Sequence, residues 1–183
     1  SFMNANETAV GGIDDEFIVF IGQTANKNFK RAYSALRKVT SCQLVCVAKK
    51  RDLLSNSQLE SKELTNVKYF QNLSDGELKS LYRRAKFLLF PSLYEGFGLP
   101  ILEAQISCCI VLTSNVGPMK VVAEGSMGSV LVDPRVEMSI AEGISRLTSI
   151  NEHDRKVLIE LGKINAEKYS VNETLNVYKE VIE

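Results

Sequence analysis

Two glutamates with seven residues between them, Glu95 and Glu103, have the types and spacing best suited to chemistry in this chain. The first is followed by the turn Gly96-Phe97-Gly98, and the second lies in a segment that Pro100 is expected to open as a helix. Before them, the unbroken apolar run Phe87–Phe90 is typical of a strand covered on both faces. The predicted order is therefore buried strand, glycine-rich turn and helix N-terminus.

This order creates a place where the polar groups of a ligand can bind. The first turn of a helix has N–H groups without partners inside the helix, and the helix dipole adds positive potential there, which suits phosphate or sugar oxygens. Gly96 and Gly98 let the backbone approach a ligand closely. The Glu103 carboxylate, about one turn into the helix, can accept two hydrogen bonds from a vicinal diol such as a ribose.

The competing interpretation is a turn that merely ends a strand, followed by an ordinary glutamate in a first helical turn. Two features favour the ligand site. Glu95 precedes the helix by several residues and caps nothing obvious. The turn also follows the C-terminal end of a strand, where open α/β sheets bind their ligands.

Apolar runs and helical periodicities alternate along the rest of the chain. Ser74 and Glu77 have the spacing of a capping box and predict a helix start, and Pro134 is expected to end the last strand. This alternation predicts an α/β fold with a Rossmann-like, doubly wound parallel sheet, although no GxGxxG fingerprint follows the first strand. The expected strands are 17–21, 44–47, 67–70, 87–90, 110–113 and 130–132. The expected helices include 28–39, 53–62, 119–123 and a last helix 171–183 that contains Tyr178. Two further helices are expected after Pro134. The apolar face of the first is Met138, Ala141, Ile144 and Leu147, and that of the second is Val157, Leu158, Leu161 and Ile164.

Composition bounds the classes of function. Lysine plus arginine (22) equals aspartate plus glutamate (22), so no basic stripe indicates a nucleic-acid or anionic-membrane partner. No apolar run approaches the ~20 residues of a membrane span. The four cysteines form no CxxC pair and His153 is the single histidine, which argues against a zinc site. We expect Cys42, Cys46, Cys108 and Cys109 to be buried free thiols in a reducing cytosol.

The stretch from Glu95 to Ala104 resembles the E-x7-E signature of retaining glycosyltransferases of family 4, also called group 1, whose two-domain architecture is GT-B. The segment 17–22 followed by Asn26-Lys27-Asn28 resembles the family's first strand and its Lys-Asn turn, and 113–115 and 131–134 resemble later landmarks. The resemblance runs from about residue 17 to residue 178 and is to the C-terminal half of the family. It implies a nucleotide-sugar-binding domain at 16–183, preceded by an N-terminal extension or expression scar at 1–15.

The resemblance also implies roles for individual residues. The donor would be a nucleotide-diphosphate sugar, with the Glu103 carboxylate on the ribose hydroxyls, Glu95 on the donor-sugar hydroxyls and the Lys27 ammonium on the diphosphate. The nucleotide would lie between the 22–28 turn and the 95–103 turn. No cofactor or metal is implied, because a lysine and helix-end N–H groups can stabilise the leaving nucleotide. The implied nucleotide-sugar-binding residues are Lys27, Gly96, Phe97, Gly98, Leu99 and Glu103, and the implied catalytic residue is Glu95.

Some positions depart from the family pattern. Gln23 stands where an arginine often binds the diphosphate, so that contact is weakened or moved, for example to Lys49, Lys50 or Arg51. Cys108 stands where the family usually has a glycine, and it would be strained if the position needs a positive φ. Lys120-Val121 replaces a Pro-Glu pair. The sequence also leaves open whether Glu95 positions the donor for front-face attack or acts as the nucleophile of a double displacement.

Two classes of function follow. The first is the donor half of a retaining glycosyltransferase that builds a polysaccharide or glycolipid. The second is a non-catalytic nucleotide- or partner-binding module of GT-B-like fold; a nucleotide-sugar epimerase of related fold fits the Gly-Phe-Gly context less well. For the first, we expect a glycan or glycolipid acceptor to bind through a separate N-terminal domain, so that this chain alone transfers no sugar. We also expect a cytoplasmic location, with the full-length enzyme able to lie at a membrane surface.

Overall fold

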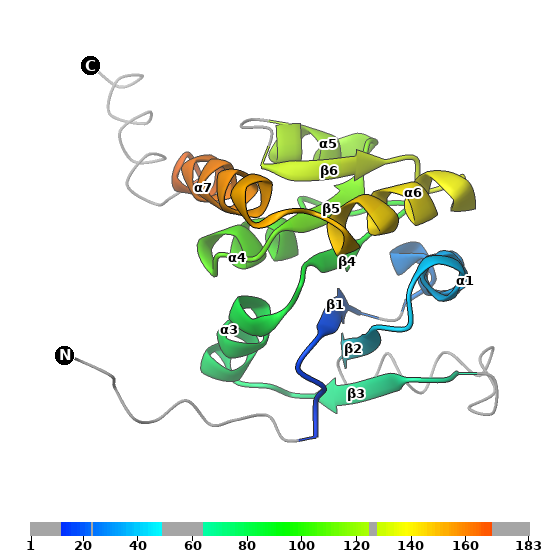
Figure 1. Ribbon diagram of the computed structural model, residues 1–183. Coiled ribbons are helices and arrows are strands. Elements are labelled where there is room, and N and C mark those ends of the chain that lie inside the picture. The colour runs from blue at the N-terminus through cyan, green and yellow to red at the C-terminus, as the bar shows by residue number, and fades with distance from the viewer. Residues whose placement is uncertain (1–11, 23, 49–63, 125–127, 170–183) are drawn as a thin grey trace, which may run out of the picture.

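Six parallel strands form a single sheet in the computed structural model, which describes residues 12–22, 24–48, 64–124 and 128–169 (Figure 1). The strand order is β3-β2-β1-β4-β5-β6. The strands are β1 (Phe17–Ile21), β2 (Gln43–Ala48), β3 (Val67–Gln71), β4 (Leu88–Phe90), β5 (Val111–Ser114) and β6 (Ser129–Val132). All six strands predicted from the sequence are confirmed, and no end is shifted by more than one residue.

Helices cover both faces of this sheet (Figure 1). One face carries α1 (Phe29–Val39) and α6 (Glu137–Thr148), and the other carries α3 (Asp75–Arg84), α4 (Leu99–Ile106) and α5 (Gly117–Glu124). The long α7 (Glu152–Glu167) packs mainly against α4, and the short 3-10 turn η1 (Ala25–Lys27) precedes α1. The predicted α/β class with a doubly wound parallel sheet is therefore confirmed.

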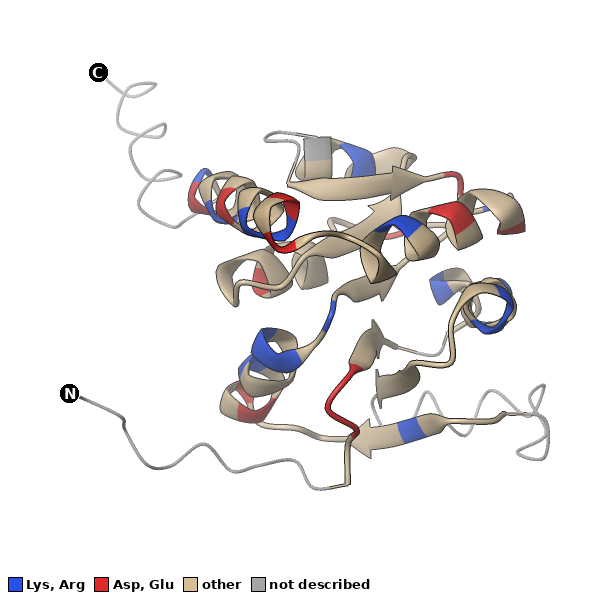
Figure 2. Ribbon diagram, in the orientation of Figure 1, with Lys and Arg blue, Asp and Glu red and all other residues tan. Residues whose placement is uncertain are grey.

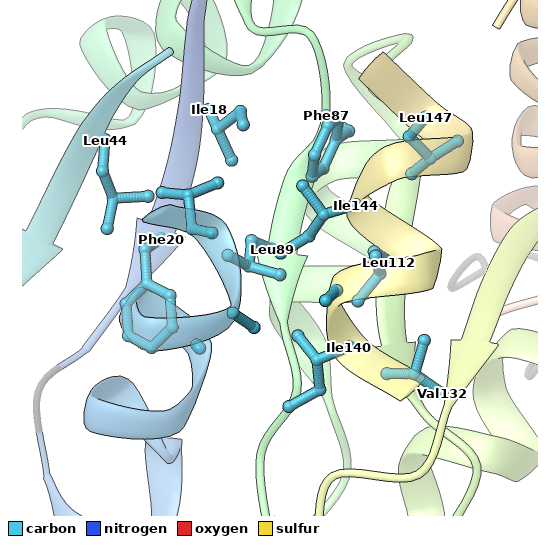
Figure 3. Packing of buried hydrophobic residues seen from close by; sticks show 14 of the residues in the cluster. Ile18, Phe20, Leu44, Phe87, Leu89, Leu112, Val132, Ile140, Ile144 and Leu147 are labelled. Carbon is cyan, nitrogen blue, oxygen red and sulfur yellow. The ribbon is translucent and has the colours of Figure 1, made fainter. Parts of the chain in front are cut away.

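The alternation of side chains along each strand produces two cores. In β1, Ile18 and Phe20 point to the α1 and α6 layer, and Phe17 and Val19 point to the opposite layer. Figure 3 shows the first core, where α6 lays Ile140, Ile144 and Leu147 against the sheet. Because both faces are covered, five of the six strands contain no charged residue, and the exception is Lys68 of the edge strand β3 (Figure 2).

The predicted start of α3 is confirmed as a capping box. The Glu77 N–H donates to Ser74 Oγ at 3.3 Å, and the Ser74 N–H donates to Glu77 Oε2 at 2.8 Å. In α4, by contrast, the helix begins one residue earlier than expected, so that Pro100 is its second residue and Gly98 its N-cap. Both positions tolerate proline because their N–H groups have no partner inside the helix.

The predicted apolar faces of the C-terminal helices were partly wrong. Met138, Val157 and Ile164 are 63%, 43% and 50% exposed. Helix α7 instead packs through small residues: a Cβ on Gly128 would lie 2.3 Å from the Gly162 nitrogen, so the two backbones are in close contact. Apolar periodicity misses such an interface, because the close approach depends on the absence of side chains. The expected helices 53–62 and 171–183, with Tyr178, lie outside the described residues.

The expectation of four buried thiols was wrong for two of them. The four cysteines are free; Cys46 and Cys109 are buried, Cys42 is partly buried and Cys108 is exposed. Burial raises the pKa of the Cys109 thiol to about 12. Among the helices that the structure describes, none has the length and apolarity to cross a bilayer.

The strand order places a topological switch between β1 and β4. From β1 the chain moves outward to β2 and β3, and it then returns to β4 on the other side of β1. The loops that leave β1 and β4 at the C-terminal edge therefore diverge, and a crevice for a ligand is expected between them. The two loops contain Lys27 and Glu95.

Candidate functional site

Lys27 and Glu95 meet at this switch point although 68 residues separate them in sequence. The Lys27 Nζ donates to Glu95 Oε1 at 2.7 Å, and the two side chains are only 16% and 13% exposed. The ammonium also lies 4.7 Å from the centroid of the Phe90 ring, at the end of β4. A positive and a negative group, both mostly shielded from water, thus share one position at the C-terminal edge of the sheet.

The turn that carries Lys27 is fixed on both sides. Gly22 has a φ of +80°, which favours glycine, and a Cβ built there would lie 2.9 Å from Lys27 Cε, so the lysine stem passes directly against this residue. Asn26 binds the loop after β4 twice: its Nδ2 donates to the Tyr94 carbonyl at 2.9 Å, and its carbonyl accepts from the Leu93 N–H at 2.7 Å. These bonds hold the backbone of the turn against the loop after β4.

Asn28 joins three loops at this edge. It adopts a left-handed conformation with a φ of 63° and is buried. Its Nδ2 donates to the Pro91 carbonyl after β4 at 3.0 Å and to the Pro134 carbonyl after β6 at 2.7 Å. Asparagine is among the few residues with a side chain that tolerate this backbone conformation, and its amide supplies both donors. The Lys-Asn pair recognised in the sequence thus consists of a charge and the residue that anchors it.

The turn before α4 presents its middle residues to solvent. Gly98, the N-cap, has a φ of 104°, and its carbonyl accepts from the Ile101 N–H at 2.9 Å. Phe97 and Leu99 are 45% and 59% exposed, and Gly96 is exposed. The Phe97 ring makes an edge-to-face contact with Tyr169 at 5.9 Å between ring centroids. The helix start is therefore open to an incoming ligand.

Glu103 is exposed on α4, where Asp75 of α3 influences it. Loss of hydration raises the pKa of the Glu103 carboxyl, and the negative charge of Asp75 raises this pKa further. A raised pKa means that, in the ligand-free protein, the hydration that ionised Glu103 has lost is not replaced by other favourable interactions. A carboxylate in this state is well suited to accept hydrogen bonds from ligand hydroxyls.

The structure therefore brings Lys27 and Glu95 into direct contact and holds Glu103 on the helix that starts at Gly98. Sequence reasoning missed the Phe90 ring beneath Lys27 and the anchoring of Asn28 to Pro134, since neither has a local signal. Gln23, Lys49, Lys50 and Arg51, the positions considered for the diphosphate, lie outside the described residues. Within the described ranges, no three histidine, cysteine, aspartate or glutamate side chains gather closely enough to hold a metal ion.

The expected strain at Cys108 is present. Its φ is 61°, the Cys108 N–H donates to the Gln105 carbonyl, and the Cys109 N–H donates to the Ala104 carbonyl. These two bonds form a Schellman motif with a cysteine at the position that glycine usually occupies. Val121, which belongs to the Lys120-Val121 pair that replaces the family's Pro-Glu pair, is 67% exposed on α5.

Comparison with known proteins places this geometry in a family. The sequence profile described as "Glycosyl transferases group 1" matches residues 6–163. An uncharacterized glycosyltransferase of Methanocaldococcus jannaschii is 30% identical over 96% of this chain and 48% of its own length. The O-antigen chain mannosyltransferase B of Escherichia coli is 36% identical over 62% of this chain and 30% of its own length. The chain spans about half the length of the first of these relatives.

Solved structures agree on the fold. A glycosyltransferase from Rickettsia africae superimposes with a TM-score of 0.78 at 21% identity, over 93% of this chain and 49% of its own. Sucrose-phosphate synthase from Thermosynechococcus elongatus gives a TM-score of 0.76 at 20% identity, over 92% and 46%. The chain therefore belongs to the group 1 glycosyltransferases, and its fold is that of the C-terminal domain of the GT-B architecture.

Proposed function

We propose that this chain is the donor-binding domain of a retaining glycosyltransferase, which moves a sugar from a nucleotide-diphosphate sugar to a glycan or glycolipid acceptor. The observation that carries the proposal is the contact between Lys27 and Glu95 at the switch point. One group can neutralise a diphosphate and the other can accept hydrogen bonds from sugar hydroxyls, and the scissile bond of a sugar nucleotide joins those two parts.

The remaining contacts follow from the same placement. The ribose hydroxyls bind Glu103, whose carboxylate is exposed on α4. The diphosphate lies against the N–H groups of Phe97, Gly98 and Leu99, where the helix dipole adds positive potential. Gly96 leaves room for the ligand, since nothing lies within 4 Å of a Cβ built there. As the donor bond breaks, Lys27 stabilises the negative charge that builds on the leaving nucleotide.

Glu95 acts in this proposal as a positioning group in a front-face reaction. Its carboxylate is held by Lys27 at 2.7 Å, and an ion-paired oxygen is a weaker nucleophile than a free one. The double-displacement alternative requires a covalent sugar–Glu95 ester, which mass spectrometry of the working enzyme with a slow fluorinated donor would detect.

We propose that the acceptor site and the other wall of the catalytic cleft belong to a separate domain of the enzyme. A bacterial relative is named for O-antigen mannosyl transfer, which is consistent with a glycan acceptor here. Because this chain supplies one wall of the cleft, we propose that it binds a donor weakly and transfers no sugar by itself. A cytoplasmic location, consistent with the free cysteines, belongs to the same proposal.

The test is a calorimetric titration of the 183-residue chain with UDP, GDP and ADP. At least one should bind, and Lys27→Met should weaken that binding. Lys86→Met is a matched control, because Lys86 forms an ion pair of the same 2.7 Å length with Glu16, at the opposite edge of the sheet. Failure of all three nucleotides at millimolar concentration would refute the proposal, as would equal effects of the two variants.

A further inference from the structure

Resting on the proposed function, we propose that the Lys27–Glu95 pair makes the site discriminate between the intact sugar nucleotide and the spent nucleoside diphosphate. The pair would hold the donor and expel the product.

The Lys27 ammonium is surrounded by contacts that favour its present position. Its stem passes against Gly22, its head lies over the Phe90 ring, and Asn26 and Asn28 on either side are bound to the loop after β4. A diphosphate that reaches this lysine must therefore come close to Glu95 as well, because the carboxylate is 2.7 Å from the same ammonium.

The two ligands differ at this contact. In a sugar nucleotide the terminal phosphate is esterified and carries one negative charge. In the free diphosphate this phosphate is joined only through the anhydride bond, and the second ionisation of such a terminal phosphate has a pKa of about 6, so at neutral pH it carries close to two charges. The additional charge of the product lies where the sugar was attached, on the side that faces Glu95 in the proposed pose.

Glu95 therefore responds oppositely to the two ligands. With the sugar present, its hydroxyl groups donate hydrogen bonds to the Glu95 carboxylate. These bonds replace the part of the Lys27 ion pair that the carboxylate loses when the phosphate also binds Lys27. With the sugar gone, the carboxylate loses its hydroxyl donors and must share Lys27 with a more negative phosphate, in a place where both side chains are mostly shielded from water and screening is reduced. The same residue that orients the donor thus weakens the binding of the product.

The decisive variant is Glu95→Gln, which keeps the size and an acceptor oxygen but removes the charge. We expect it to tighten binding of the free diphosphate by about two- to fivefold, the range for one partly screened charge contact, and to leave binding of the sugar nucleotide equal or weaker. The probes are UDP, GDP and ADP, each paired with UDP-glucose, GDP-mannose or ADP-glucose. Glu16→Gln is the matched control, since it removes the carboxylate of the distant Lys86 pair.

A second measurement uses a different ligand. The β-methyl ester of the same nucleoside diphosphate lacks both the sugar and the additional charge. Because Lys27 attracts that charge and Glu95 repels it, Glu95→Gln should shift the ratio of the two affinities toward the free diphosphate, and thermal unfolding would confirm that the variant is folded.

The outcomes separate the two proposals. If a diphosphate binds but Glu95→Gln leaves its affinity unchanged or lowers it, the discrimination is refuted and the nucleotide site stands. If the ratio of the affinities for the diphosphate and its methyl ester is the same in the wild type and in Glu95→Gln, the discrimination is likewise refuted. If none of the nucleotides binds, both proposals fall.

Discussion

Replacing Glu103 by alanine tests the proposed ribose contact with the least disturbance of the fold. The side chain is exposed on α4, and its carboxyl pKa is raised by lost hydration and by Asp75. A carboxyl whose pKa is higher in the folded than in the unfolded state is destabilising when ionised, and this effect is relieved as the pH falls through the folded pKa. At neutral pH, the free energy of unfolding should therefore be unchanged or slightly higher in Glu103→Ala.

The expected loss is in nucleotide affinity. A hydrogen bond to a charged acceptor contributes about 1.5–3 kcal/mol, which corresponds to roughly a ten- to a hundredfold change in the dissociation constant. Because Glu103 is exposed, the low end of this range is expected.

A double-mutant cycle can assign the effect to the ribose. The 2′,3′-dideoxy form of the nucleoside diphosphate removes the hydroxyls from the ligand side, and calorimetry gives the four affinities. Either change alone should weaken binding by a similar factor. The two changes together should reduce the affinity little more than one change does, because both remove the same contact. Glu142→Ala, an exposed glutamate on α6 at the other face of the sheet, is the matched control.

Two results would refute this reasoning. Additive losses in the cycle would mean that Glu103 and the ribose hydroxyls do not meet. A lower unfolding midpoint in Glu103→Ala, with nucleotide affinity intact, would identify Glu103 as a residue that supports the helix.

Three further predictions concern the same region. Nucleotide affinity should fall as the pH decreases through the raised pKa of Glu103, and Asp75→Asn should move the midpoint of this fall to lower pH. The pH dependence measured with Glu103→Gln serves as the control, because it contains only the protonation of the nucleotide itself. Cys108→Gly should stabilise the chain by about 0.5–1 kcal/mol, because relief of a left-handed conformation that costs ~1–2 kcal/mol exceeds the additional entropy of glycine. Cys108→Ala keeps the strain and should not stabilise the chain. Equal urea unfolding midpoints for the wild type and Cys108→Gly would contradict the explanation. Asn28→Gly keeps the ability to adopt the left-handed conformation but loses the hydrogen bonds to the Pro91 and Pro134 carbonyls, so it should lower the free energy of unfolding by about 1–3 kcal/mol in the same assay.

Much of the architecture could be read from the sequence because it depends on local patterns. Unbroken apolar runs such as Phe87–Phe90 identify strands covered on both faces, and the Ser74–Glu77 spacing identifies a capping box. The E-x7-E stretch carried the family resemblance, which the profile match at 6–163 confirms. The family resemblance also anticipated that Cys108, which stands where the family usually has a glycine, would be strained if the position needs a positive φ, and its φ is 61°.

The errors arose where packing overrides periodicity. Helix α7 was expected to bury an apolar face, but it makes its closest contact at Gly162, and Asn165 is fully buried with its Nδ2 donating to Gln105 and to the Val122 carbonyl. A glycine and an asparagine carry no hydrophobic signal, so only the facing backbone could indicate this interface.

The sequence by itself determined the elements and the residue types of the site, and the tertiary structure decided which of those residues meet. Nothing local relates Lys27 to Glu95 across 68 residues. Their contact exists because β4 lies beside β1 in the sheet order, so that both loops leave the same edge at the same place. The strand order depends on long-range burial of both sheet faces, which is a property of the whole chain, and it turns a loop lysine and a turn glutamate into a shielded pair of charges.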